Sequence, residues 1–240
     1  FEQMEHQWFC KEGTDQEYYA EYKKRAWQFL LDLGFKEEHL RFHDHDKLAH
    51  YAKAACDIQY DFPMGWSELN GIHNRTDYDL SRHQEYSGKS MTYVDPVTQE
   101  RYIPYVIEYS IGADRLMLAT LSEAYDEETL ENGEVRNVMR FHPAIAAYKA
   151  AVLPLQKGLA PQAKELLQKL KKRFLVTYDE AGSIGKRYRR QDEIGTPYCL
   201  TVDFDTLQDG TVTVRDRDTM EQVRMTADEV VAFLTEKCAF

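Results

Sequence analysis

The second half of the sequence alternates between short apolar runs and amphipathic segments, and this alternation constrains the fold more than any other feature. Residues 148–155 form an apolar run typical of a buried strand, whereas 160–174 and 183–193 have the spacing of helices. Strands that alternate with helices indicate an α/β layer structure around a mostly buried sheet. Thr226 and Glu229 match the capping-box pattern, so we expect the last helix to begin there.

The first half has a longer and less regular pattern. Apolar residues recur at helical spacing over residues 16–33 and stop at Gly34, which predicts a long helix. Residues 54–62 alternate between apolar and polar side chains, as a half-buried strand does. We also expect strands at 1–9, 65–72 and 101–109, a hairpin turn at 96–100, a helix over 113–124, and irregular structure at 40–52 and 75–89.

An acidic stretch separates these two patterns. Residues 122–136 are rich in Glu and Asp, which predicts a solvated connection, and Pro143 marks the passage into the second pattern. We therefore expect two domains, residues 1–140 and residues 141–240.

The composition is typical of a soluble globular protein. Of the 240 residues, 43% are hydrophobic and 30% are charged, and no run approaches the roughly 18 apolar residues of a membrane span. A membrane role is therefore not expected. The four cysteines have no close spacing, which favours a reduced, cytoplasmic protein over a disulfide scaffold or a zinc site.

The charge is unevenly distributed along the chain. The formal net charge is −11, of which residues 1–140 carry −12 and residues 141–240 carry +1. The second half is therefore the better candidate for a phosphate-rich partner. Its basic residues gather in two predicted helices, with Lys169, Lys171, Lys172 and Arg173 at the end of one and Lys186, Arg187, Arg189 and Arg190 in the other.

The sequence YVIEYSIGADRLMLA carries the strongest chemical signal. It reads as a buried strand that ends near Ser110, turns at Gly112 and enters a helix led by Asp114 and Arg115. Glu108 and Ser110 alternate along the strand, so they project to the same side of it. An arginine at a helix amino terminus suits a nucleotide phosphate. The alternative is that Arg115 only neutralises nearby acids.

Several long segments, in order, resemble one family. YVIEYSIGADR is similar to motif 3 of class II aminoacyl-tRNA synthetases in its glycyl form. FEQME resembles the strand that leaves the motif 2 loop, and GWSEL and RTDYDLSRH resemble segments between motifs 2 and 3. GSIGKRYRRQDEIGTPYCLTVDFDT resembles the anticodon-binding domain of the same dimeric glycyl-tRNA synthetases. The resemblance covers nearly the whole chain.

The resemblance implies a fold and an activity. The fold is α+β: an incomplete antiparallel sheet of the class II type over residues 1–140, followed by an α/β anticodon-binding domain with a mixed sheet over 141–240. The activity is ATP-dependent ligation of glycine to tRNA(Gly), with ATP entering as its Mg2+ complex, in a cytoplasmic homodimer. No general base and no tightly bound cofactor are expected.

The resemblance also implies site residues. Glu5, Glu108 and Ser110 surround the glycine ammonium, and Arg115 contacts the γ-phosphate. The full glycine-binding set is Phe1, Glu2, Gln3, Met4, Glu5, Glu108, Tyr109, Ser110, Ile111 and Gly112. The ATP-binding set is Glu68, Leu69, Gly112, Ala113, Asp114 and Arg115, and the tRNA-binding set is Lys186, Arg187, Arg189 and Arg190.

Two departures from the family pattern bear on activity. Tyr109 stands where the family usually has proline, and we expect its bulk beside the glycine pocket to reduce or abolish activity. Motif 1 and most of motif 2 do not occur after Phe1, so we expect this chain alone to be inactive. The alternative function is a synthetase-like protein that binds tRNA or another nucleic acid without catalysis.

Two other motifs have simpler interpretations. His43, Asp44, His45, Asp46 and His50 include common metal ligands, but their spacing favours a polar loop. GSIGK ends like a phosphate-binding loop, yet its glycine spacing is wrong and Arg187 replaces the required Ser or Thr. We therefore predict no metal site and no such loop. The KRYRR cluster also has an alternative interpretation as a solvated helix face.

Overall fold

The computed structural model describes residues 1–240, and the chain forms two compact units, residues 1–122 and 123–240. Each unit has its own five-stranded sheet and its own apolar core. None of the helices combines the length and the apolar character needed to cross a membrane.

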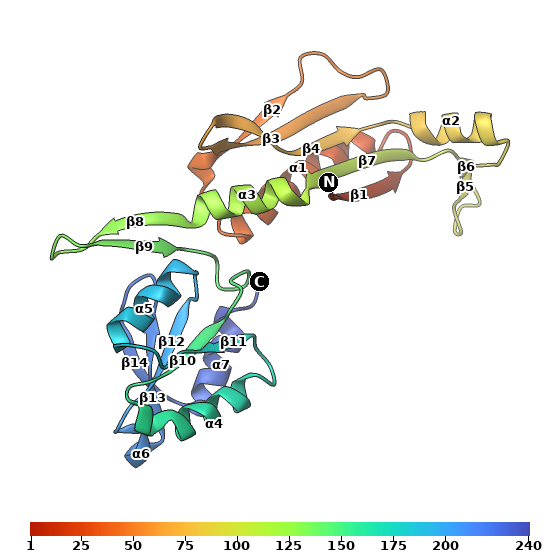
Figure 1. Ribbon diagram of the computed structural model, residues 1–240. Coiled ribbons are helices and arrows are strands. Elements are labelled where there is room, and N and C mark those ends of the chain that lie inside the picture. The colour runs from red at the N-terminus through yellow and green to blue at the C-terminus, as the bar shows by residue number, and fades with distance from the viewer. The chain divides into compact units, whose positions relative to one another are not determined.

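The first unit is built on an antiparallel sheet, as predicted (Figure 1). Every neighbouring pair of strands in it is antiparallel, and the strand order is β1-β7-β4-β3-β2. The strands are β1 (Gln3–Cys10), β2 (Leu40–Asp44), β3 (Ala54–Phe62), β4 (Gly65–Asn74) and β7 (Tyr105–Gly112).

One face of this sheet is covered by helix α1 (Asp15–Asp32), which confirms the long helix predicted there (Figure 1). Tyr22, Ala26 and Leu30 of the helix are buried in one cluster with Ile72 and Ile107 of the strands. Because side chains alternate along a strand, the residues next to Ile72 and Ile107 face the other way. The second face of the sheet is therefore left to polar side chains.

Helix α3 (Ala113–Ala124) continues directly from β7, as predicted. The amide of Ala113, its first residue, donates a hydrogen bond to the carbonyl of Glu2 at 3.0 Å. This bond joins the first residue of α3 to the residue before β1. The amino-terminal ends of this helix and of this edge strand therefore lie together beside the polar face.

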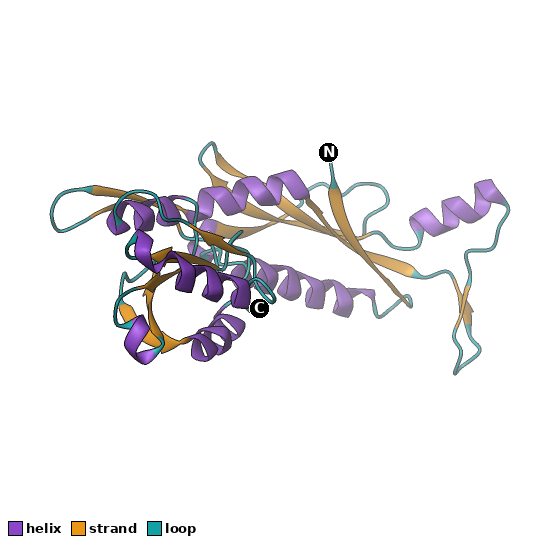
Figure 2. Cartoon of the chain, turned by 60° about the horizontal axis from the view of Figure 1, so that its bottom comes forward, coloured by secondary structure: helices purple, strands orange, loops and turns teal.

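Two elements of the first unit were not predicted. Helix α2 (Tyr78–Ser87) lies where we expected a loop, and β2 lies within the segment expected to be irregular. Helix α2 buries no residue, so it has no apolar periodicity to detect. The predicted hairpin is present as β5 (Tyr93–Val94) and β6 (Arg101–Tyr102), and Figure 2 shows it extending with α2 beyond the sheet.

The second unit contains the predicted α/β layers with a mixed sheet of order β11-β10-β12-β13-β14. Strand β10 is parallel to both of its neighbours, and the remaining pairs are antiparallel. The strands are β10 (Ala150–Pro154), β11 (Val176–Tyr178), β12 (Tyr198–Val202), β13 (Thr211–Asp216) and β14 (Gln222–Thr226).

Helices cover both faces of this sheet. Helices α4 (Ala160–Leu170) and α7 (Ala227–Lys237) share one apolar cluster with the strands, and α5 (Ile184–Glu193) packs in another. The capping box of α7 is confirmed, because Thr226 and Glu229 bond each other's backbone amides. Two short helices, Lys157–Leu159 and α6 (Thr206–Asp209), complete the unit.

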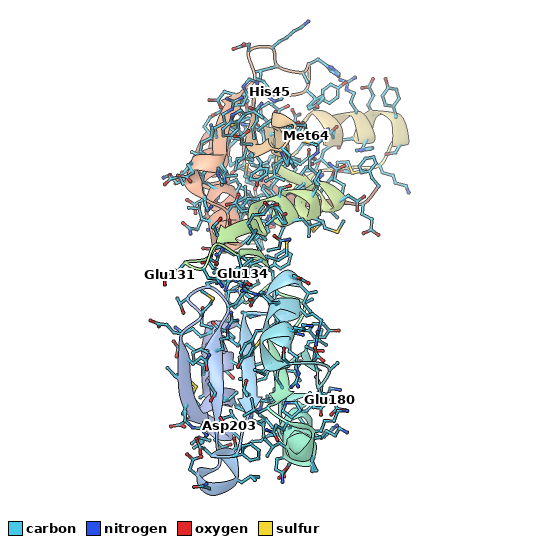
Figure 3. All side chains as sticks on the ribbon, turned by 60° about the vertical axis from the view of Figure 1, so that its left-hand side comes forward. His45, Met64, Glu131, Glu134, Glu180 and Asp203 are labelled. Atoms are coloured by element: carbon cyan, nitrogen blue, oxygen red, sulfur yellow. The ribbon has the colours of Figure 1, made fainter.

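The acidic stretch is largely exposed, as predicted, but its strands β8 (Tyr125–Thr129) and β9 (Val135–Met139) pair as a hairpin, which was not predicted (Figure 3 labels Glu131 and Glu134 in its turn). Arg136 of β9 is fully buried, with ion pairs to Glu128 at 3.0 Å and to Asp192 of α5 at 3.7 Å. The hairpin therefore belongs to the second unit, although the functional boundary near residue 140 stays a prediction.

Candidate functional site

The register of β1 and β7 gathers polar side chains on the face of the first sheet that α1 leaves uncovered. Glu5 pairs with Ser110 and Gln7 pairs with Glu108. On the other side of β7, Gly71 pairs with Ser110 and His73 with Glu108. Because paired residues of neighbouring strands point the same way, all of these side chains share one face.

A cavity of about 510 Å³ opens where this face meets α3. Its walls come from the start of β1, the β3–β4 turn, the end of β7 and the first turns of α3. Arg115 lies at its edge, exposed, and one of its guanidinium nitrogens (Nη1) donates to the carbonyl of Glu68 at 2.7 Å. The lining residues include Glu2, Gln3, Met64, Glu68, Leu69, Ser110, Gly112, Asp114 and Arg115; Met64 is labelled in Figure 3.

A second hollow of about 310 Å³ lies further along the same face. Glu5, Gln7 and Glu108 line one part of it, and Arg75 and Asp79 line another. Glu108 is only 6% exposed, and both of its carboxylate oxygens are bound. Its Oε1 accepts from Arg75 Nη1 at 2.9 Å, and its Oε2 accepts from Gln7 Nε2 at 3.0 Å.

Arg75 contacts Asp79 and Tyr51 as well as Glu108. Its Nε and Nη2 donate to the two oxygens of Asp79 at 2.7 and 3.3 Å, and its guanidinium carbon lies 4.4 Å from the centre of the Tyr51 ring. The hydrogen bonds with Asp79 and the charge of Glu108 raise the pKa of Arg75, against the effect of burial. The arginine is therefore a fixed cation between two carboxylates.

His73 lies on the other side of Glu108. Its Nδ1 is 3.8 Å from Glu108 Oε1. Burial lowers the pKa of His73, and this effect outweighs the opposing charges of Glu108 and Asp57. The ring is therefore neutral at neutral pH, so Arg75 is the only full positive charge bonded to Glu108.

Comparisons with known proteins agree with this geometry. The chain is 60% identical to a glycine–tRNA ligase of Clostridium kluyveri and 59% identical to one of Geobacillus kaustophilus, and both matches cover 100% of the chain. The chain is a homologue of the glycine–tRNA ligases. The resemblance found in the sequence is thereby confirmed. The chain spans about half the length of these curated relatives, 52% and 53% respectively.

Two further matches concern the domains of this glycine–tRNA ligase homologue. Residues 149–237 match the family model described as an anticodon binding domain. The crystal structure of the RNA binding domain of threonyl-tRNA synthetase from Cryptosporidium parvum Iowa II has a TM-score of 0.70 at 17% identity. That match covers 99% of the chain and 64% of the solved structure. It shows the fold, and it confirms the predicted fold class.

The structure brings most of the predicted ATP-site residues of the ligase homologue together. Five of the six line the 510 Å³ cavity, and only Ala113 does not. The predicted glycine residues divide between the two hollows. Phe1, Glu2, Gln3, Ser110 and Gly112 line the larger hollow, and Glu5 and Glu108 line the smaller.

Three residues predicted for the glycine pocket face the opposite way. Met4, Tyr109 and Ile111 alternate with the polar residues, so their side chains lie on the α1 face. Tyr109 packs edge-on against Phe29 of α1, with ring centres 6.5 Å apart, and Ile111 is in the core. The expectation that the bulk of Tyr109 crowds the glycine pocket is therefore wrong.

The predicted tRNA-binding cluster of α5 is only partly available. Arg187 is buried, and its guanidinium donates to the carbonyls of Pro154 and Gly182. Arg190 bonds Asp179 and the carbonyl of Ala181. Lys186 is exposed, and the nearest acid to Arg189 is 3.9 Å away. Arg187 is thus a structural residue, and Lys186 and Arg189 remain free for an anion.

The histidine-rich segment builds no metal centre. His43 and Asp44 lie in β2, and His45 forms an ion pair with Asp57 at 2.8 Å. No group of three or more His, Cys, Asp or Glu side chains in the 240 residues is arranged to hold a metal ion.

Sequence reasoning missed Gln7, His73 and Arg75. Gln7 follows Gln3 and Glu5 at a spacing of two, which is the period of a strand, so this signal was present. Arg75 and Asp79 are four residues apart, but that spacing indicates a surface ion pair as readily as a site. The contact of Arg75 with Glu108 depends on the pairing of β4 with β7, which the sequence does not show.

Proposed function

We propose that this chain supplies part of the glycine and ATP site, and the tRNA-binding domain, of an enzyme that joins glycine to tRNA(Gly). The observation that carries the proposal is the common face of β1 and β7. On it, the polar residues expected to bind glycine adjoin the cavity that contains the residues expected to bind ATP. The 60% identity to glycine–tRNA ligases over the whole chain supports the same conclusion.

The glycine ammonium is the group that this face suits best. Glu5, Glu108 and Ser110 offer carboxylate and hydroxyl oxygens on one side of the sheet. A carboxylate and an ammonium about 4 Å apart attract by about 4 kcal/mol at an effective dielectric constant near 20. Because glycine has no side chain, the site discriminates by excluding anything larger at the α-carbon.

The larger cavity suits the triphosphate of ATP. Arg115 donates one of its five N–H groups to the carbonyl of Glu68, so the other four are free for a γ-phosphate. ATP enters as its Mg2+ complex, in which oxygens of the phosphates are the magnesium ligands. The glycine carboxylate attacks the α-phosphorus and pyrophosphate leaves. A hydroxyl of the terminal ribose of tRNA then attacks the glycyl carbonyl of the adenylate, and AMP leaves. Positioning and charge stabilisation supply most of this catalysis.

The second unit is the proposed tRNA-binding part. It matches an anticodon binding domain, and it contains the less acidic half of the chain. Lys186 and Arg189 of α5 lie free of strong ion pairs, and Lys171, Lys172 and Arg173 are exposed after α4. These cations are the proposed phosphate contacts. A cytoplasmic homodimer remains part of the proposal for the whole protein.

The alternative of a non-catalytic binding protein rested on Tyr109 and on the motif 1 and motif 2 sequences that do not occur after Phe1. The structure removes the first of these two grounds, because the Tyr109 side chain lies on the other face of the sheet.

Glycine-dependent exchange of pyrophosphate into ATP tests the proposal in the natural full-length protein. We expect exchange with glycine and none above background with alanine. Glu108→Gln keeps the shape but loses the charge, and we expect it to reduce kcat/KM for glycine by about 100-fold or more. Exchange that does not depend on glycine, or an unaffected Glu108→Gln variant, would contradict the proposal.

A further inference from the structure

The contacts of Arg75 carry an inference beyond the glycine-binding residues themselves. Arg75 does not belong to the strand pair that faces glycine, yet it makes the only bond from a charged group to Glu108. Its guanidinium is planar and is fixed on its other edge by both oxygens of Asp79. A carboxylate bound to such a fork is held in both position and orientation.

The burial of Glu108 explains why this contact matters. Glu108 is 6% exposed, and Glu5 and Asp79 line the same hollow. A buried carboxylate that loses its bonded cation is left as an uncompensated charge beside other acids. His73, the other basic group beside it, is neutral because burial lowers its pKa.

We propose that Arg75 is a positioning residue for glycine recognition: it holds the Glu108 carboxylate in place and aims it at the proposed site of the substrate ammonium. This role rests on the proposed function of the face. Asp79, in the first turn of α2, and the ring of Tyr51 hold the guanidinium in turn. Glycine affinity is thereby linked to the segment that leads into α2.

Kinetics of pyrophosphate exchange in the natural full-length protein test the role. For Arg75→Ala we expect the KM for glycine to rise by about 10-fold or more, with the KM for ATP changed by less than about 2-fold, because Arg75 does not line the ATP cavity. Guanidinium ions added at millimolar concentration are expected to lower the glycine KM of this variant. Arg82→Ala is the matched control, since Arg82 pairs with Glu85 on the exposed surface of α2.

Arg75→Lys keeps the proposal testable if Arg75→Ala does not fold, as judged by thermal unfolding. Lysine keeps the charge but cannot bond Glu108 and Asp79 through one rigid fork. We expect its glycine KM to rise by about 3-fold or more, with ATP again unaffected. A folded Arg75→Lys with the wild-type glycine KM, or equal effects on glycine and ATP, would overturn the role of Arg75. No glycine-dependent exchange in the wild type would instead overturn the proposed function, and this role with it.

Discussion

Glu108 and Tyr109 are neighbours in the sequence but lie on opposite faces of the first sheet. Glu108 faces the hollow shared with Arg75, and Tyr109 packs against Phe29 of α1. This separation decides how far the proposed site departs from the family pattern, because the unusual residue is directed away from the face proposed to bind glycine. A residue next to a binding residue in a strand is thus among the least informative about the site.

Tyr109→Phe should therefore leave glycine recognition intact. The Tyr109 hydroxyl has no hydrogen bond of good geometry, although Asn70 lies beside it, so its removal costs little. We expect the glycine KM to stay within about 2-fold of wild type and the free energy of unfolding to change by less than about 1 kcal/mol. Exchange kinetics and urea unfolding would measure the two quantities. A large rise in the glycine KM would place Tyr109 in the pocket after all.

Gly71→Ala should disturb the proposed glycine site through His73. A Cβ at Gly71 would lie 2.7 Å from Cε1 of His73, so the ring must move, and Glu108 is next to it. We expect a loss of about 1–3 kcal/mol in the free energy of unfolding and a higher glycine KM. The control is Gly185→Ala, where a Cβ meets nothing within 4 Å and alanine favours the helix. An equal free energy of unfolding for the two variants would show that the His73 ring moves without loss of stability.

Asp15 makes the free energy of unfolding of the first unit depend on pH. Burial acts to raise its pKa, but hydrogen bonds from Lys53, Asn74 and the Gly13 amide lower it overall. Because the folded-state pKa lies below the unfolded value of about 4, the carboxylate stabilises the fold above about pH 4. That contribution is lost as the pH falls through the folded-state pKa.

Asp15→Asn should therefore lower the free energy of unfolding by about 2 kcal/mol at pH 7, and by less below about pH 4. Urea unfolding of the natural full-length protein at several pH values would measure the difference. Glu100→Gln breaks an exposed pair with Lys11 and should change stability by less than about 0.5 kcal/mol. A pH-independent effect of Asp15→Asn would mean that the loss comes from packing and not from charge.

Binding of tRNA should depend on Lys186 and Arg189, which are free for an anion on α5. Each alanine substitution should weaken binding and reduce the slope of log affinity against log salt by about 0.7–0.9. Lys237→Ala, an exposed lysine on α7, is expected to leave both quantities unchanged. Filter binding with tRNA(Gly) at several salt concentrations would measure them. Unchanged affinity and slope in both α5 variants would remove α5 from the tRNA contacts.

Periodicity in the sequence predicted elements that bury an apolar stripe, and the two elements that it missed are largely exposed. Helix α1 and strand β3 were found because their apolar residues repeat at helical or strand spacing. Helix α2 and strand β2 were not found, because α2 buries no residue and β2 buries only Leu40. Periodicity reports burial, so it cannot report elements that face water.

The site was predicted as runs of consecutive residues, and the sheet selects every second one. Family resemblance identified FEQME and the residues from Glu108 to Gly112, but strand alternation turns Met4, Tyr109 and Ile111 to the other face. Arg187 was also misjudged, because a basic cluster on a helix does not show which member points inward. In each case the missing information is the tertiary partner of a side chain.

The buried Arg136 has a consequence for how the second unit can be separated from the rest of a protein. The family model begins at residue 149, but the ion pairs of Arg136 join β9 to Asp192 of α5, and Asp192 also binds Arg215 of the sheet. A fragment cut at residue 141 would open this charged cluster to water. The smallest portable module therefore begins near residue 123, so recombination or domain grafting should carry the hairpin along with the domain.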